Sequence, residues 1–292
     1  MNKEKRNFYK KQYDSINYFN ENFSSSIVSL KQSYWNKIYK EKIHKFLKTR
    51  INISEEFELK NIHKYLDEDF LLVKKGNHPS NDRNKISELM FEFGDDNQDT
   101  YIEFVKWIHS DIIKEDFYFQ KTPTIRLHIP NQIFSYPKWH SDCFLGHSPK
   151  EINFWFGLTD NKESGFWVLD LKESKKWLKQ YEYNLERFFD EASLPGETFN
   201  QNVFEKAEEI NNISDRVTIF DGRCIHTALN RTEKDPTTRI SIDTRIILKK
   251  EYSWDKINHE ALYVGKGIKK AHFKPGGKFG YHQKSIQEIL NE

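Results

Sequence analysis

The sequence has few cysteines, no long apolar run and no marked excess of one charge. Cys143 and Cys224 are its only cysteines, which excludes a disulfide framework or a zinc site built from cysteine pairs. No stretch approaches the roughly 18 consecutive apolar residues of a membrane-spanning helix. Lys and Arg number 46 against 44 Asp and Glu, so we expect no nucleic-acid partner. The charged start MNKEKRNFYKKQY has no apolar segment after it, and we expect a cytoplasmic protein without membrane contact.

Aromatic residues supply much of the material for a core. Hydrophobic residues make up only 37% of the 292 residues, but aromatic residues reach 15%, with 23 Phe, 14 Tyr and 7 Trp. Each large ring buries roughly 150–250 Å², so a packed interior remains possible. We expect residues 1–292 to form a single domain.

The spacing of apolar residues changes near residue 120. Before it, spacings of three and four predict helices, as at 34–47 and 100–113. After it, short β-type runs predict strands, with one helical insertion at 174–191. The predicted strands are 124–129, 151–159, 165–171, 216–220 and 239–248.

This order of elements predicts an α+β fold, with helices packed on one sheet. We expect a mainly helical N-terminal region at 1–120 and a sandwich-like or barrel-like core at 121–250. A C-terminal extension follows at 251–292.

A histidine and an aspartate two residues apart form the first part of a candidate metal site. His140 and Asp142 share one face if this segment is extended. His226, shortly after the predicted strand 216–220, offers a third ligand. Two imidazoles and one carboxylate form the facial triad of non-heme Fe(II) oxygenases, which leaves coordination positions open. An isolated H-x-D is a weak signal, because a lone histidine is more often a structural hydrogen-bonding residue; the later histidine strengthens the prediction.

The predicted strand 239–248 carries a row of polar residues. In the run RISIDTR, alternation places Arg239, Ser241, Asp243 and Arg245 on one face. Arginine binds carboxylates in a bidentate manner, and serine can add a hydrogen bond. A dicarboxylic keto acid can therefore chelate iron at its 2-oxo end while Arg239 and Ser241 hold its distal carboxylate. Arg245 pairs either with Asp142 or with the C1 end of the keto acid.

Other polar residues near these segments are weaker candidates. Asn153 lies on the predicted strand after His140 and Asp142, where it either binds the co-substrate or is simply a structural polar residue. Arg126 and His128 share a face of an earlier predicted strand and are candidates for cofactor or substrate contact.

The order of these residues resembles a known family. A first H-x-D, a later histidine and a strand that opens with R-x-S resemble the 2-oxoglutarate/Fe(II) dioxygenases with a double-stranded β-helix (jelly-roll) core. The segments WHSD, EINFWFGLTD, SGFWVLDL and IFDGRCIHTALN are similar to the phytanoyl-CoA-dioxygenase branch. The similarity extends to oxygenases of bacterial carbohydrate and aminoglycoside gene clusters, such as the streptomycin-cluster type. It covers about residues 124–247.

The resemblance implies a jelly-roll core and an oxidoreductase that uses Fe(II), 2-oxoglutarate and O2. It implies His140, Asp142 and His226 as iron ligands and Arg239 as the partner of the 2-oxoglutarate C5 carboxylate. The gap of 13 residues between His226 and Arg239 exceeds the about ten or eleven common in the family. The main 2-oxoglutarate anchor is therefore open between Arg239 and Arg245.

The resemblance also bears on the reaction and the substrate. Halogenating members carry a small residue where this chain has Asp142, so hydroxylation or a related oxidation is implied. The implied substrate is a small polar metabolite, with a sugar, a nucleotide-linked sugar or an aminocyclitol as candidates.

Two other functions remain open. Nucleic-acid dealkylating oxygenases also carry an arginine pair six residues apart, as in Arg239 and Arg245, but the near-neutral charge argues against this function. A non-catalytic jelly-roll binding protein would tolerate loss of a ligand, whereas all four positions are filled here. The sequence does not indicate an oligomeric state.

Overall fold

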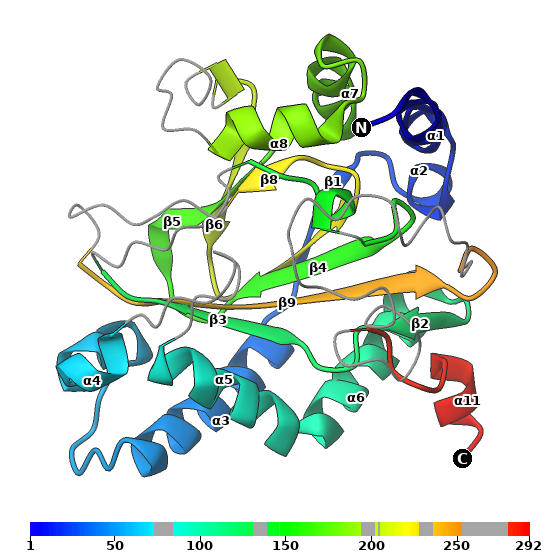
Figure 1. Cartoon of the computed structure of the whole chain (residues 1–292). Helices are drawn as coiled ribbons and strands as arrows, with labels where there is room; N and C mark the ends of the chain where they lie inside the picture. Colours follow the sequence, from blue (N-terminus) through cyan, green and yellow to red (C-terminus); the bar gives the residue numbers. More distant parts are fainter. Residues whose placement is uncertain are drawn as a thin grey trace.

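Most helices come before residue 114, and most strands of the antiparallel sheets follow it (Figure 1). The structure is a computed structural model. The residues it describes are 1–72, 84–130, 139–145, 147–193, 202–203, 205–227, 236–252 and 280–292. Most of the predicted C-terminal extension, at 253–279, lies outside them. Within the described residues, none of the helices combines the length and apolar content that crossing a membrane requires.

Two antiparallel sheets form the β structure. The large sheet has the strand order β1-β7-β4-β9-β2, and β3 also pairs with β9. Its strands are β1 (Ile27–Lys31), β2 (Phe117–Phe119), β3 (Thr124–His128), β4 (Ile152–Gly157), β7 (Arg216–Asp221) and β9 (Arg239–Leu248). The small sheet has the order β6-β5-β8 and comprises β5 (Asn161–Val168), β6 (Glu208–Asn212) and β8 (His226–Thr227). The predicted α+β class is confirmed as a mixture of helices and antiparallel sheet.

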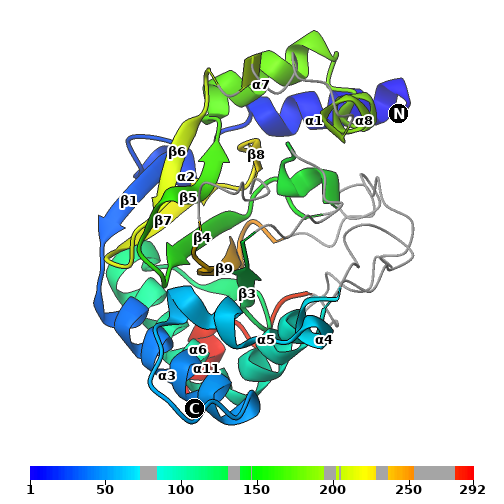
Figure 2. The same ribbon diagram turned by 90° about the vertical axis from the view of Figure 1, so that its left-hand side faces the viewer.

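Helices lie on both sides of the large sheet (Figures 1 and 2). One side is covered by α3 (Tyr34–Arg50), α4 (Glu68–Leu71), α5 (Lys85–Asp96), α6 (Gln98–Trp107) and α11 (Ile286–Leu290). The other side carries α1 (Lys3–Asp14), α2 (Tyr18–Asn22), α7 (Leu171–Gln180) and α8 (Leu185–Ser193). Shorter helical turns are the 3₁₀ segments Leu59–Tyr65 and Asp142–Leu145 and the π segment Ile108–Ile113.

Alternation along β9 gives the large sheet one apolar face and one polar face. Ile240 and Ile242 are fully buried, and Ile242 lies opposite Ile125 of β3 and Phe156 of β4. These side chains belong to the core that also contains buried residues of α3, α5 and α6. The four polar residues between them project to the opposite face, as period-two geometry predicts: Arg239, Ser241, Asp243 and Arg245.

The predicted helices exist, but two of them end differently. The helix predicted at 34–47 continues to Arg50. The helix predicted at 100–113 becomes a π segment at Ile108, which ends at Lys114 with a φ of 58°. The insertion predicted as one helix is two helices, because Glu182 and Tyr183 both have positive φ values and turn the chain.

The large sheet takes two of its strands from the first 120 residues, and neither was predicted. β1 pairs with β7 along five residues, and β2 pairs with β9. Both strands are short, so their sequences carry little periodic signal. The N-terminal region is therefore hydrogen-bonded into the same sheet as the residues near His226.

A buried ion pair ties α1 and α2 to the turn after β7. Asp221 and Arg223 are both 0% exposed, and Arg223 Nη2 lies 2.6 Å from Asp221 Oδ2. Arg223 Nη1 donates to the carbonyl oxygens of Gln12 and Ser15 at 2.9 and 2.8 Å. The pair therefore holds the N-terminal helices on the segment that leads to His226.

We expect Asp221→Ala to lower the free energy of unfolding by about 3–5 kcal/mol, because it leaves the Arg223 charge buried without its carboxylate. Urea unfolding measures the change. The control is Glu41→Ala, which removes an exposed helix-surface pair with Lys37 at 4.0 Å. This control should stay within about 0.5 kcal/mol of wild type. A similar small loss in Asp221→Ala would contradict the role assigned to the buried pair.

Candidate metal centre

Three predicted ligands come together between the two sheets. One ligand atom each from His140, Asp142 and His226 all lie within 4.8 Å of one another. The two histidines face each other across an antiparallel bridge, with backbone N–H···O distances of 3.0 and 2.8 Å. Asp142 begins a 3₁₀ turn. Residues 86 positions apart in the sequence are thus joined by main-chain hydrogen bonds.

Burial sets the protonation of the three side chains. Desolvation lowers the pKa of His140 well below its usual value, and it also lowers the pKa of His226. Burial alone would raise the pKa of Asp142, but the charge and hydrogen bond of Arg245, together with the effects of His226 and His147, outweigh it and hold the pKa well below its usual range. The cluster therefore has neutral imidazoles beside an ionised carboxylate, which are the forms that bind metals.

The His226 ring is held in one tautomer. Its Nδ1 lies 3.0 Å from the carbonyl oxygen of Cys224. Because a carbonyl oxygen can only accept, Nδ1 carries the proton and Nε2 keeps its lone pair. That Nε2 lies 3.8 Å from Asp142 Oδ1. A backbone carbonyl that orients a ligating histidine in this way is common at metal sites.

Asp142 is oriented by two donors from the large sheet. Its Oδ2 accepts from Asn153 Nδ2 at 2.7 Å and from Arg245 Nε at 2.9 Å. Arg245 Nη2 donates to Oδ1 at 3.2 Å. The structure thus places Arg245 and Asn153 against the aspartate. Of the two partners considered for Arg245, Asp142 is the one it contacts.

Arg239 and Ser241 lie buried on the same face of β9. Arg239 is 2% exposed, donates from Nη1 to the carbonyl oxygen of Gly165 on β5, and places Nη2 3.1 Å from His128 Nδ1. Ser241 is 0% exposed, and its Oγ has no hydrogen-bond partner within the described part of the chain. A buried hydroxyl without a partner is costly, so this position favours a polar ligand.

Asp243 joins two arginines, but not the pair that lies beside it on β9. Arg126 Nε donates to Asp243 Oδ2 at 2.6 Å, and Arg245 Nη1 lies 3.4 Å from Asp243 Oδ1. Cross-strand contact with β3 therefore provides one of the two partners, since Arg126 lies opposite Ser241.

The N-terminal helix also supports the site, and sequence reasoning did not find this contact. Tyr13 of α1 donates to Ser141 Oγ at 3.0 Å, and Ser141 donates to the Gly222 carbonyl oxygen at 3.0 Å. Gly222 packs closely there, because a Cβ atom would lie 2.7 Å from the carbonyl oxygen of Glu151. No local pattern signals contacts between such distant segments.

The two cysteines near the ligands are inert in character. Cys143 and Cys224 are both buried. Desolvation raises the pKa of the Cys143 thiol to about 12 and raises that of Cys224 well above its usual value. Protonated, buried thiols behave as small hydrophobic residues.

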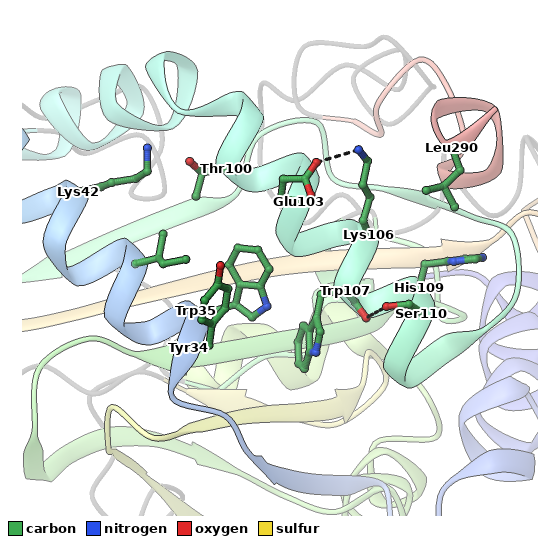
Figure 3. A pocket seen from close by; sticks show the side chains of 11 residues that line it. Tyr34, Trp35, Lys42, Thr100, Glu103, Lys106, Trp107, His109, Ser110 and Leu290 are labelled. Carbon is green, nitrogen blue, oxygen red and sulfur yellow. Dashed lines mark hydrogen bonds and ion pairs between the residues drawn. The ribbon is translucent and has the colours of Figure 1, made fainter. Parts of the chain in front are cut away.

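A surface groove of about 620 Å³ lies away from this cluster (Figure 3). Trp35 of α3, Trp107 of α6 and Leu290 of α11 contribute to its lining. The three candidate ligands are not among its lining residues. The helices that form the groove cover the apolar side of the large sheet, whereas Asp142 contacts Arg245 on its polar face.

Comparisons with known proteins give weak matches. No family model matches the chain. A stretch of 42 residues is 43% identical to "Streptomycin biosynthesis protein StrG" from Streptomyces griseus. The match spans 14% of this chain and about a fifth (21%) of the length of that relative.

The structure is also similar to several solved structures at low sequence identity. The non-heme alpha ketoglutarate dependent carbocyclase SnoK from nogalamycin biosynthesis is 11% identical, with a TM-score of 0.40 over 84% of this chain and 83% of SnoK. EctD from S. alaskensis, with 2-oxoglutarate and 5-hydroxyectoine, is 11% identical, with a TM-score of 0.41 over 77% of this chain and 73% of EctD. AviO1 from Streptomyces viridochromogenes Tue57 is 11% identical, with a TM-score of 0.38 over 78% of this chain and 92% of AviO1. Because both the sequence identities and the TM-scores are low, these similarities do not indicate an activity for this chain.

We expect Tyr13→Phe to lower the free energy of unfolding by about 1 kcal/mol, because it removes the hydrogen bond to Ser141 and keeps the ring. Urea unfolding gives the value. Tyr34→Phe is the control, since the Tyr34 side chain is 62% exposed and its substitution should change stability by less than about 0.5 kcal/mol. Equal effects in the two variants would show that the Tyr13 hydroxyl adds nothing.

Proposed function

We propose that this protein is a non-heme Fe(II) oxygenase that uses 2-oxoglutarate and O2 to oxidise a small polar metabolite. The observation that carries the proposal is the convergence of His140, Asp142 and His226 within 4.8 Å. The order of H-x-D and a later histidine in the sequence predicts the same three residues. We place the protein with the phytanoyl-CoA-dioxygenase-like branch of the 2-oxoglutarate oxygenases.

The donor set fits a ferrous ion. Two neutral imidazoles and one ionised carboxylate match the facial triad that binds Fe(II) and leaves positions for other ligands. Asp142 Oδ2 accepts from two donors, whereas Oδ1 accepts only the longer 3.2 Å bond from Arg245 Nη2 and faces His226 Nε2, so Oδ1 would be the oxygen that holds a metal ion. Bound there, Fe(II) with 2-oxoglutarate would supply the O2 activation that substrate oxidation requires.

The surrounding charges also suit a divalent cation. Among the described residues, three carboxylates and two guanidinium groups form one contact network, which His147 joins through Glu151: Asp142, Asp243, Glu151, Arg126 and Arg245. Buried charge is costly unless it is compensated. A metal ion beside Asp142 would provide that compensation.

Arg239 and Ser241 are the proposed anchor for the distal carboxylate of 2-oxoglutarate. Arg245 already donates two hydrogen bonds to Asp142. We therefore favour Arg239 as the main partner of the 2-oxoglutarate carboxylate. Ser241 adds a buried hydroxyl that has no hydrogen-bond partner among the described residues. Asn153, bound to Asp142, acts by holding that ligand in place.

The arrangement of the sheets supports a jelly-roll core in a single domain. The candidate site lies between the polar face of the large sheet and the small sheet, since Arg239 of β9 contacts Gly165 of β5. The pairing of β1 with β7 makes the N-terminal region part of the same sheet. We therefore treat residues 1–292 as one domain.

The proposed reaction is hydroxylation or a related oxidation. Asp142 occupies the position that a halide would need, so halogenation is not proposed. A sugar, a nucleotide-linked sugar or an aminocyclitol is the proposed substrate class. The match to a protein named for streptomycin biosynthesis supports this class.

We expect His140→Ala to abolish Fe(II)-dependent conversion of 2-oxoglutarate to succinate and to weaken metal binding by at least tenfold. Succinate is measured with Fe(II), ascorbate and 2-oxoglutarate, and metal binding by titration calorimetry. His109→Ala, which changes a histidine at the surface groove, should leave both unchanged. Unaltered metal binding in His140→Ala would remove the assignment of the metal centre.

We expect Ser241→Ala to raise the KM for 2-oxoglutarate roughly tenfold, because one hydrogen bond to a charged group is lost. Metal affinity should change little, since Ser241 is not a proposed ligand. Ser29→Ala is the matched control, because the Ser29 hydroxyl is already bonded to Thr218 at 3.1 Å. If the KM stays constant in Ser241→Ala and rises in Arg245→Ala while metal affinity in Arg245→Ala is unchanged, the anchor is Arg245 instead.

A further inference from the structure

A second buried carboxylate lies beside the candidate metal centre. Glu151 is 1% exposed and precedes β4. The Tyr281 hydroxyl donates to Glu151 Oε1, and His147 Nδ1 lies 3.0 Å from Oε2. Arg245 Nε lies 4.0 Å from the same Oε2. The nitrogen that donates to Asp142 thus also faces Glu151.

Tyr281 reaches this position because the segment that begins at Gly280 is hydrogen-bonded to β2 and to the two residues that follow it. Lys121 N donates to the Gly280 carbonyl oxygen at 3.0 Å, and His282 N donates to the Phe119 carbonyl oxygen at 2.7 Å. Gln120 forms an isolated bridge with Tyr281. The C-terminal segment is thereby fixed against β2 and the residues that follow it.

The same contact region also holds Arg245 directly. Gln120 Oε1 accepts from Arg245 Nη1 at 3.0 Å. Arg245 is therefore constrained by Asp142, by Asp243, by Gln120 and by the Glu151 carboxylate that Tyr281 satisfies. These contacts form a continuous path from the C-terminal segment to a proposed iron ligand.

We propose that Tyr281 and Glu151 are positioning residues for Asp142, acting through Arg245, so that residues 280–292 help to set the affinity for the metal. The inference rests on the proposed metal centre. Its physical basis is competition between two buried carboxylates for one guanidinium group. When the Tyr281 hydroxyl satisfies Glu151, Arg245 stays on Asp142; without the hydroxyl, Glu151 draws Arg245 away and Asp142 loses its orientation.

Burial of Tyr281 keeps the hydroxyl able to donate. Desolvation, followed by the charge of Glu151, raises the pKa of Tyr281 well above its usual value. The phenol is therefore protonated over the range in which the protein would work.

The test uses Co(II) as a probe for the metal site of the full-length protein. Tyr281→Phe keeps the ring and removes the donor. We expect its dissociation constant for Co(II) to rise about tenfold, with a changed visible absorption band, because the band reports the ligand geometry. Thermal unfolding of the metal-free variant verifies that it is folded.

A double-mutant cycle separates positioning from general loosening of the structure. In the Glu151→Gln background, Tyr281→Phe should change the Co(II) dissociation constant by less than about twofold, whatever the affinity of Glu151→Gln itself. Tyr252→Phe is the matched control, since its ring packs edge-on against Tyr281 at 5.7 Å. It should leave both the affinity and the absorption band unchanged.

A second variant removes a different contact of Arg245, the hydrogen bond to Gln120. Gln120→Ala removes the acceptor of Arg245 Nη1 and should weaken Co(II) binding about threefold. Weaker binding in Tyr281→Phe that disappears in the Glu151→Gln background supports the proposal, as does weaker binding in Gln120→Ala if Tyr281→Phe does not fold.

Three results would overturn the proposal. Unchanged Co(II) affinity in folded Tyr281→Phe overturns it while leaving the proposed oxygenase function intact. Equal loss of affinity in both backgrounds overturns it by showing a purely structural effect. Absence of Co(II) binding by the wild-type protein removes the proposed function and this inference together.

Discussion

The paired main-chain hydrogen bonds between His140 and His226 are the interaction on which the rest of the site depends. They align two segments that lie far apart in the sequence, and they bring both imidazoles close to the carboxylate of Asp142. Side-chain contacts then refine the arrangement: Cys224 selects the tautomer of His226, and Arg245 orients the aspartate. A main-chain bridge is well suited to this task because it constrains position without using the groups that bind the ligand.

The candidate site could be predicted largely because its parts have short-range patterns. His140 and Asp142 are two residues apart, and alternation along β9 places Arg239, Ser241 and Arg245 on one face. Helix periodicity likewise indicated α3 and α6, together with the region of α7 and α8. In each case a single segment carried the signal, so no long-range contact had to be known.

The features that escaped prediction all depend on partners far away in the sequence. Alternation identified the polar face of β9 but not that Asp243 would take Arg126 from β3 as a partner. β1 is a strand because β7 is available to pair with it. The break between α7 and α8 requires two residues with positive φ. Burial of Tyr181 and Tyr183 offsets the backbone strain of this turn.

The contacts of Arg223 also have a consequence for the order in which the protein can assemble during synthesis. Arg223 follows Ser15, whose carbonyl oxygen it binds, by 208 residues. At a translation rate of about 5–20 residues per second, roughly 10–40 s pass before that partner is made. During this interval the aromatic side chains of α1 and α2 have no sheet to pack against. The ribosome-bound chain would therefore expose them to chaperones and proteases until β7 emerges.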